Sequence, residues 1–351
     1  MCDLFEIISS KKIYHANEIN KIFKGQVNNS FPYVVRTTQN NGIRGYIIKD
    51  ELYLNDENTL SFAQDTFSVF YQKEKYFTGN KVKILKAKFE NQSEQVMQYL
   101  TASFQKSLNS STWGLGSTIL TMAETKIKLP TKNNKIDFEF MESFIADLVA
   151  QRISKLETYL EASGLTNYTL TDEEQKALDD FENEKIEFGE FTFKSIFNEI
   201  YQGRRLTKDD QVSGSIPFVM AGVSNTGVVN HISNPVASFP ENSITIDIFG
   251  NTFYRNYSYG AGDDTGVYWN SKIKYSKETM LFFTTSMEKS IFGKFDFGKK
   301  LRSSQSLDFK IKLLTKNEEP SYKIMETLIS AIQKLVIKDV VLYTNKKLGK
   351  S

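Results

Sequence analysis

Two stretches of this 351-residue chain space their apolar residues three or four positions apart over a long distance. The first begins at Asp137 and runs through Met141, Phe144, Ile145, Leu148, Val149, Ile153, Leu156 and Leu160. The second follows Pro320 and runs through Met325, Leu328, Ile329, Ile332, Leu335, Val336, Val340 and Tyr343. This spacing puts the apolar side chains on one face of a helix, and Gly164 is a typical helix end. We therefore predict long helices in residues 136–165 and 317–351, whose apolar faces pair as a coiled coil or pack only on their own domains.

Shorter patterns elsewhere predict strands and turns. The β-prone runs at 33–35 and 218–220 each follow a proline and each enter a loop rich in glycine and amide residues, at 37–42 and 222–227. Such loops favour turns with positive φ and expose amide side chains. Residues 54–63 and 243–249 are strand-like, and residues 92–108 and 277–289 are helix-like. The prediction is a mixed α/β (α+β) domain in each half of the chain.

These features occur twice in the same order. Residues 31–47 return as 216–232, Ile127-Lys-Leu-Pro returns as Ile311-Lys-Leu-Leu, and each copy then reaches a Met-Glu pair, at 141 and 325. The separation is roughly 185 residues at each point, which is far longer than the period of about 20–50 residues of solenoid repeats. The sequence therefore predicts one large globular unit that is used twice.

An acidic segment separates the two copies. Net charge is +6 over residues 1–135, −11 over 136–190 and +5 over 191–316, although the whole chain carries only +2. Basic bodies suit a polyanion, whereas the acidic part should face away from it. Thr171 and Glu174 form a capping-box pattern that predicts a short helix. We divide the chain into a first domain (1–135), a long helix (136–165), an acidic connector helix (166–190), a second domain (191–316) and a second long helix (317–351).

Composition excludes several classes of protein. Cys2 is the only cysteine, so the chain cannot form an internal disulfide, and we expect a cytoplasmic protein. The first residues lack the basic and apolar segments of a signal peptide, and no apolar run is long enough to span a membrane.

The motifs of several enzyme classes are absent from the sequence. There is no phosphate-binding Gly-x-x-x-x-Gly-Lys-Ser/Thr, no Gly-x-Gly-x-x-Gly and no Pro-Pro pair, which excludes the Asp/Asn-Pro-Pro-Tyr/Phe motif of amino-methyltransferases. His15 and His231 show no metal-ligand spacing. Asp263 and Asp264 lie in a glycine-rich turn and are expected to form that turn. We therefore expect no catalytic site and no metal site in this chain.

The repeated order resembles the specificity (S) subunits of type I restriction-modification enzymes and of the related type IIB systems. It is carried by residues 31–47 and 216–232, and by Lys126-Ile-Lys-Leu-Pro130 before Ile136-Asp-Phe-Glu-Phe-Met-Glu142. The segments Asn242-Ser-Ile-Thr-Ile and Phe297-Gly-Lys-Lys-Leu-Arg302 also match the family. The resemblance implies two target-recognition domains joined by two long antiparallel helices. It also implies double-stranded DNA as a partner, together with methyltransferase (modification) subunits that carry S-adenosylmethionine and restriction subunits that cleave.

Amide and arginine side chains in the loops are the candidates for reading bases, since Asn or Gln suits adenine and Arg suits guanine. Lysine and arginine also suit phosphate, where they fix the register of the protein on DNA. In the first copy the predicted DNA-binding residues are Arg36, Gln39, Asn40, Asn41 and Arg44. In the second copy the predicted base readers are Ser224, Asn225, Thr226, Asn251 and Arg255, and the predicted phosphate contacts are Arg204, Arg205, Lys299, Lys300 and Arg302.

The function predicted from these patterns is a DNA-recognition subunit that reads a bipartite, gapped target and docks partner subunits without catalysing a reaction itself. Two alternatives come from other classes of protein. The first is a nuclease or transferase with a divergent site in one domain, and the second is a scaffold that binds other proteins through its acidic connector.

Overall fold

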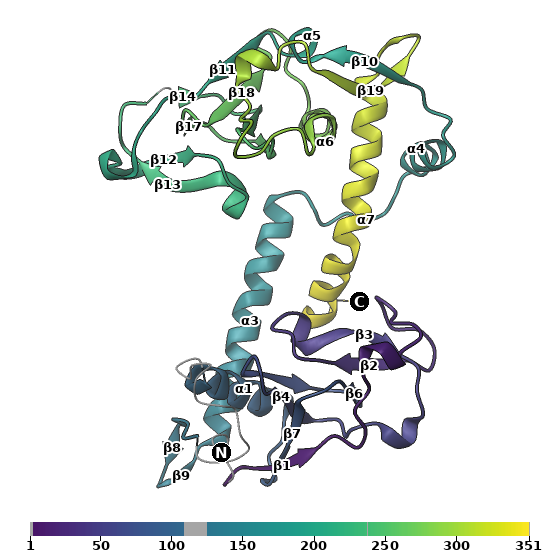
Figure 1. Ribbon diagram of the computed structural model, residues 1–351, viewed down its shortest axis with the longest axis vertical. Coiled ribbons are helices and arrows are strands. Elements are labelled where there is room, and N and C mark those ends of the chain that lie inside the picture. The colour runs from purple at the N-terminus through teal and green to yellow at the C-terminus, as the bar shows by residue number, and fades with distance from the viewer. Residues whose placement is uncertain (1–2, 109–124, 237, 351) are drawn as a thin grey trace. The chain divides into compact units, whose positions relative to one another are not determined.

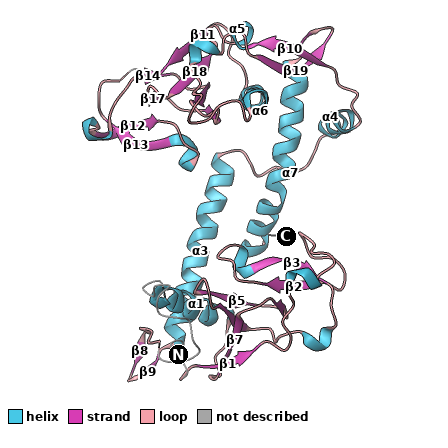
Figure 2. Ribbon diagram, in the orientation of Figure 1, coloured by secondary structure: helices cyan, strands magenta, loops and turns pink. Residues whose placement is uncertain are grey.

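The computed structural model describes residues 3–108, 125–236 and 238–350, and Cys2 lies outside these ranges. The chain divides into two compact units, Met1–Leu156 and Glu157–Ser351. Each unit combines helices with several small sheets (Figures 1 and 2). The prediction of mixed α/β content in each half is confirmed.

The first unit is built around an antiparallel sheet with the strand order β1-β7-β4-β5. These strands are β1 (Phe5–Ser9), β4 (Thr59–Ala63), β5 (Ser68–Gln72) and β7 (Val82–Ala87). A smaller sheet has the order β3-β2-β6, formed by β2 (Phe31–Val34), β3 (Ile43–Ile47) and β6 (Phe77–Thr78). The short helices η1 (Ala16–Glu18), η2 (Asn40–Gly42) and η3 (Glu51–Tyr53) lie in its connections. Strand β6 runs parallel to β2, whereas β3 runs antiparallel to it.

Helix α1 (Glu94–Leu108) covers the larger sheet of the first unit. Its buried face, Val96, Met97, Leu100, Phe104 and Leu108, packs with Phe5, Leu60, Phe62 and Leu85 of the sheet. The hairpin of β8 (Thr131–Lys132) and β9 (Lys135–Ile136) leads into the long helix α3 (Phe138–Ala162). Met141, on the first turn of α3, is fully buried in the same core. This methionine therefore fastens the start of the helix to its own unit.

The second unit repeats this plan. Its larger sheet has the order β11-β18-β15-β16, from β11 (Glu199–Gln202), β15 (Ser243–Asp247), β16 (Thr252–Arg255) and β18 (Thr265–Trp269). A second sheet has the order β13-β12-β17-β14, formed by β12 (Ser213–Val219), β13 (Val228–Ile232), β14 (Ser238–Phe239) and β17 (Tyr259–Ala261). The short helices η5 (Lys208–Asp210), η6 (Ser224–Gly227) and η7 (Ser303–Gln305) lie in loops. Strand β17 runs parallel to β12, as β6 does to β2.

The helices of the second unit also match those of the first. Helix α6 (Lys277–Ile291) takes the place of α1, and α7 (Tyr322–Leu348) takes that of α3. Strands β10 (Phe188–Thr192), β19 (Lys310–Lys316) and β20 (Glu319–Pro320) form a sheet beside them, and α5 (Phe193–Ile196) follows β10. Met325 of α7 is fully buried in the core, as Met141 is in the first unit. The predicted repeat is therefore confirmed at the level of strand order, and both Met-Glu pairs mark the same anchoring point.

The acidic connector contains α4 (Asp172–Glu182), which begins with the predicted capping box. The Thr171 hydroxyl accepts from the Glu174 amide at 3.2 Å, and the Glu174 carboxylate accepts from the Thr171 amide at 2.8 Å. The same carboxylate accepts from Lys334 and Ser330 of α7, each at 2.7 Å. Although most of α4 is acidic and exposed, Glu174 is buried and holds the helix on α7.

Candidate nucleic-acid interface

The two polar loops have nearly the same backbone conformation. In the first loop (residues 37–42) Asn40 and Asn41 have φ of 48° and 53°, and in the second loop (222–227) Asn225 and Thr226 have φ of 47° and 53°. A glycine with positive φ follows each pair. Asparagine tolerates the left-handed region, but a β-branched threonine is strained there. A strained Thr226 must therefore be held in place by its surroundings.

The same side-chain bond closes both loops. The Asn40 amide donates to the carbonyl oxygen of Ile43 at 2.9 Å, and the Asn225 amide donates to that of Val228 at 3.2 Å. Both asparagines remain exposed to solvent. Their amide nitrogens are occupied in closing the turn, so each has its amide oxygen left to present outward.

The predicted DNA-binding residues in and beside the first loop are of two kinds: some are exposed to solvent, and others bond to neighbouring residues of the unit. Gln39 and Arg44 are exposed. Arg36 forms an ion pair with Asp65, which also binds Lys81 at 3.1 Å, and these two cations hold the pKa of Asp65 below its usual range. The Asn41 amide donates to the carbonyl oxygen of Tyr71 at 2.8 Å. Gln39 and Arg44 are thus the side chains best placed to reach a ligand.

In the second unit the structure corrects one prediction and refines others. Arg255 is 1% exposed, so its side chain lies inside the unit and is not presented to a base. The Thr226 hydroxyl accepts from Arg255, and the Asn251 amide donates to the Asp247 carboxylate at 2.7 Å. Ser224 and Asn225 are exposed. The sequence predicts Arg255 as a base reader because arginine suits guanine, but its guanidinium donates to Thr226, Thr245 and Tyr257 inside the unit.

A buried carboxylate that the sequence analysis missed organises the second loop. Asp247 accepts from the amides of Phe249 and Asn251 at 2.8 and 2.9 Å and from the amide of Gly222 at 3.0 Å. Asp263 and Asp264 form a turn, as predicted, and the Asp264 carboxylate accepts from the backbone amide of Ala221 at 3.0 Å. The signal for Asp247 was its place between a strand and a Phe-Gly-Asn turn, where carboxylates commonly accept backbone amides.

The predicted phosphate-binding residues Arg204, Arg205, Lys299, Lys300 and Arg302 are all exposed. Hydrogen bonds bring both of their segments, 204–205 and 299–302, to the turn that contains Asp263 and Asp264 or to the residues packed beside it. The Arg204 amide donates to the carbonyl oxygen of Ala261 at 2.8 Å, and the Arg302 guanidinium donates to that of Asp263. The Leu301 amide donates to the carbonyl oxygen of Ile248 at 2.9 Å. Asp264 also bonds the backbone amide of Ala221, next to the second loop. The turn at Asp263 and Asp264 therefore connects the basic segments to the second loop.

Lys299 and Lys300 belong to an aromatic segment. The Lys300 ammonium lies 4.9 Å from the ring centre of Phe297, and the Lys299 ammonium lies 5.6 Å from that of Phe295. Phe297 is 82% exposed. Exposed aromatic rings interleaved with basic side chains suit a nucleic-acid surface, where cations meet phosphate and rings meet bases or sugars.

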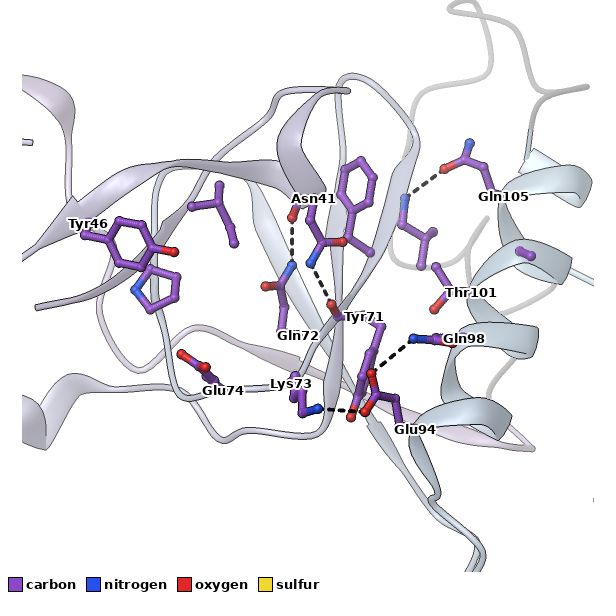
Figure 3. Close-up of a pocket in the computed structure, with 15 residues that line it drawn as sticks. Asn41, Tyr46, Tyr71, Gln72, Lys73, Glu74, Glu94, Gln98, Thr101 and Gln105 are labelled. Carbon is purple, nitrogen blue, oxygen red and sulfur yellow. Dashed lines mark hydrogen bonds and ion pairs between the residues drawn. The ribbon is translucent and has the colours of Figure 1, made fainter. Parts of the chain in front are cut away.

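A groove of about 640 Å³ lies beside the first loop, between β5 and α1 (Figure 3). Asn41 and Gln72 lie on its loop side, and Gln98, Thr101 and Gln105 line it from α1. Glu94 accepts from Lys73 at 2.7 Å and from Gln98 at 3.2 Å. Asn41 bonds the carbonyl oxygen of Tyr71, and Gln72 bonds that of Asn41, so the first loop is held by strand β5.

Within residues 3–108, 125–236 and 238–350, no cluster of three or more His, Cys, Asp or Glu side chains could hold a metal ion. No helix in the described ranges is both long and apolar enough to cross a membrane.

Comparisons with known proteins agree with this geometry. The family model for the type I restriction modification DNA specificity domain matches residues 1–158 and again 185–342. The chain is 25% identical over 342 residues to the type II restriction enzyme BgcI specificity subunit S.BcgI of Heyndrickxia coagulans, covering 95% of this chain and 94% of that protein.

Among solved structures, the S subunit of the type I restriction-modification system from M. genitalium matches with a TM-score of 0.61 and 16% identity, over 99% of this chain and 90% of that one. At this identity the likeness concerns the fold alone. The family model nevertheless covers most of the chain in two copies, and the resemblance found in the sequence is confirmed. The chain belongs to the family of type I restriction-modification DNA specificity domains, and it is a DNA specificity subunit of a restriction-modification system.

Proposed function

We propose that each unit reads one half of a gapped, two-part DNA sequence. The observation that carries this proposal is that the same loop, with the same positive-φ pair and the same closing bond, is built once in each unit. Their exposed side chains differ, since Gln39 lies in the first loop and Ser224 in the second, and the exposed Arg44 follows the first loop on β3. Two readers with one geometry and different side chains suit a target whose two halves have different base sequences.

Positioning on the duplex would come from the basic side chains. Arg204, Arg205, Lys299, Lys300 and Arg302 are exposed and would bind phosphates of either strand without regard to sequence. Bases would then be read by Gln39, Arg44, Ser224 and Asn225, together with the outward amide oxygens of Asn40 and Asn41. This division separates affinity, which depends on salt, from specificity, which depends on the loops.

The long helices would set the gap between the two half-sites. Helix α3 contains 25 residues and α7 contains 27, so at 1.5 Å per residue each is about 40 Å long. One turn of duplex measures about 34–36 Å, which is the spacing at which two readers reach the same face of DNA. In our proposal the two helices run antiparallel as a coiled coil and act as the spacer.

We further propose that partner subunits supply the chemistry. A modification subunit would carry S-adenosylmethionine and methylate adenine, and a restriction subunit or domain would cleave. The support is membership of the specificity family and the name of the relative S.BcgI, which is the specificity subunit of a restriction enzyme. The outer surface of the proposed pair of long helices is where we place the docking site for such partners.

Selection of bound duplexes from a random pool tests the proposal. The full-length chain is incubated with the pool at two salt concentrations, and the bound DNA is sequenced. The expected result is a motif of two short conserved blocks separated by a gap of fixed length, on a background of binding that weakens as salt rises. A single uninterrupted block, or no enrichment above the pool, would contradict it.

A further inference from the structure

A buried side chain from the neighbouring hairpin holds the second loop from inside. The Arg255 guanidinium donates through Nη1 to the Thr226 hydroxyl at 3.1 Å and through Nη2 to the carbonyl oxygen of Thr226. Its Nε donates to the Thr245 hydroxyl at 3.1 Å, and Nη1 also donates to the Tyr257 hydroxyl at 3.0 Å. The ring centres of Phe253 and Tyr259 lie 5.3 and 5.8 Å away. Thr226, the strained residue of the loop, is therefore gripped at both its backbone and its side chain.

The first unit contains the same arrangement with a different side chain. Gln72 is buried, and its amide donates to the carbonyl oxygen of Asn41 at 3.0 Å and to the Ser61 hydroxyl at 2.9 Å (Figure 3). Asn41 occupies in the first loop the position of Thr226 in the second.

Strand register shows that the two arrangements are equivalent. Gln72 pairs with Thr59, the first residue of β4, and Arg255 pairs with Ser243, the first residue of β15. In both units that first residue shares a hydrogen bond with a buried tyrosine, Thr59 with Tyr76 at 3.0 Å and Ser243 with Tyr259 at 2.8 Å. Gln72 and Arg255 are chemically unlike, but they occupy equivalent positions in the two units. Each donates to the equivalent carbonyl oxygen of the loop in its own unit.

Physical chemistry favours a positioning role over a general stabilising one. The hydrogen-bond acceptors of Arg255 in the structure are neutral oxygens, so a full charge is buried where burial alone is unfavourable. An apolar side chain would fill the same space at less cost, but it could not bond the loop. Arg255 and Gln72 each donate to the carbonyl oxygen of the second residue with positive φ in the loop. This hydrogen bond fixes the backbone of the loop and therefore the direction of its other side chains.

We propose that Arg255 and Gln72 are positioning residues for base recognition, each fixing the reading conformation of the loop in its own unit without touching DNA. This inference rests on the proposed function. It assigns one anchor to each half of the target, so a defect in one anchor affects one half only.

The test uses binding-site selection with the full-length chain and variants of similar side-chain volume. Arg255→Met and Gln72→Met remove the donors, whereas Arg255→Gln keeps one amide donor, as the first unit does. Tyr259→Phe and Tyr76→Phe are matched controls, because each removes one buried hydrogen bond from the same hairpin region without releasing the loop. Circular dichroism establishes that each variant is folded, and affinity for a random duplex is measured in parallel.

The expected result is asymmetric. Arg255→Met lowers discrimination between preferred and mismatched bases about tenfold in one half-site and leaves the other unchanged, and Gln72→Met does the reverse. Affinity for the random duplex stays within about twofold, because the phosphate contacts remain. Arg255→Gln retains more discrimination than Arg255→Met. If Arg255→Met does not fold, Arg255→Gln and the neutral Gln72→Met provide the same comparison.

Two results would overturn the inference alone. One is a wild-type motif in two blocks that folded Arg255→Met and Gln72→Met both select unchanged. The other is an equal loss of discrimination in the Tyr→Phe controls, which would indicate a general effect of stability. A wild-type chain that selects no two-block motif would instead overturn the proposed function, and the inference with it.

Discussion

The contact between α4 and α7 depends on a buried ion pair whose contribution can be worked out from its pKa. The Glu174 side chain is 8% exposed and that of Lys334 is 16% exposed. Burial on its own would raise the pKa of the Glu174 carboxyl. The hydrogen bonds from Lys334, the Thr171 amide and Ser330, and the positive charge of Lys334, outweigh burial and lower that pKa from 4.5 to about 2.

The size of this shift sets the expected free energy. A carboxyl whose pKa falls from 4.5 to about 2 on folding contributes about 3 kcal/mol to stability when fully ionised. Because the folded-state pKa is the lower one, the contribution is complete above pH 4.5. It is lost as the pH falls from 4.5 to about 2.

We predict that Glu174→Gln lowers the free energy of opening of α4 by about 3 kcal/mol at pH 7, since it leaves the Lys334 ammonium buried without a carboxylate. Native-state hydrogen exchange of the α4 amides measures this directly, and a two-domain chain need not unfold in a single step for that measurement. Asp180→Asn is the matched control, because it removes the more exposed ion pair with Lys176 on the same helix and should cost less than about 1 kcal/mol.

The pH dependence provides the refutation. The difference between wild type and Glu174→Gln should be constant from pH 7 to about pH 5 and should shrink below pH 4.5. A difference below about 1 kcal/mol at pH 7 would refute the reasoning, as would a difference that stays constant down to pH 3.

Three further predictions concern the second loop, the basic segments and the spacer. Gly227→Ala should lower the free energy of unfolding of the second unit by about 2 kcal/mol or more, because the new Cβ would lie 2.7 Å from the carbonyl oxygen of Met220 at a φ of +82°. In the control Gly298→Ala the new Cβ meets only the end of the Asp296 side chain, at 3.4 Å. Equal melting temperatures for the two variants would contradict this prediction. Replacing Lys299 and Lys300 with alanine should weaken binding to any duplex and reduce the slope of log affinity against log salt by about 2 without altering base preference, whereas the control Lys310→Ala, a lysine paired with Glu190, should leave the slope unchanged. Four residues inserted into α3 and into α7 should lengthen the selected gap by one or two base pairs, since each helix grows by about 6 Å; an unchanged gap would exclude the helices as the spacer.

The long helices could be predicted because their signals are local. Apolar spacing predicts helices in residues 136–165 and 317–351, and α3 (Phe138–Ala162) and α7 (Tyr322–Leu348) lie within these ranges and start two and five residues later than predicted. The capping box at Thr171 and Glu174 needs only a four-residue window. That Glu174 also reaches α7 could not be foreseen, because its partners are more than 150 residues away along the chain.

The loops were located from sequence, but their supports were not. Asn40 and Asn225 stand in repeated segments, so their shared conformation followed from similar residues. Gln72 and Arg255 are equivalent only through strand register, and no similarity between an amide and a guanidinium reveals it. The sequence predicts Arg255 as a base reader because arginine suits guanine and charged side chains are usually exposed. Arg255 departs from that rule because its donors meet the acceptors of a strained loop.

The central claim is that each unit reads its own half of the target, and paired loop variants test it most directly. Gln39→Ala with Arg44→Ala changes the first loop, and Ser224→Ala with Val223→Ala changes exposed side chains of the second loop without touching the closing asparagines. Selection from the same random duplex pool should show altered bases in one block for the first pair and in the other block for the second, with an unchanged gap. If both pairs alter the same block, or each pair alters both, the two units do not read separate halves.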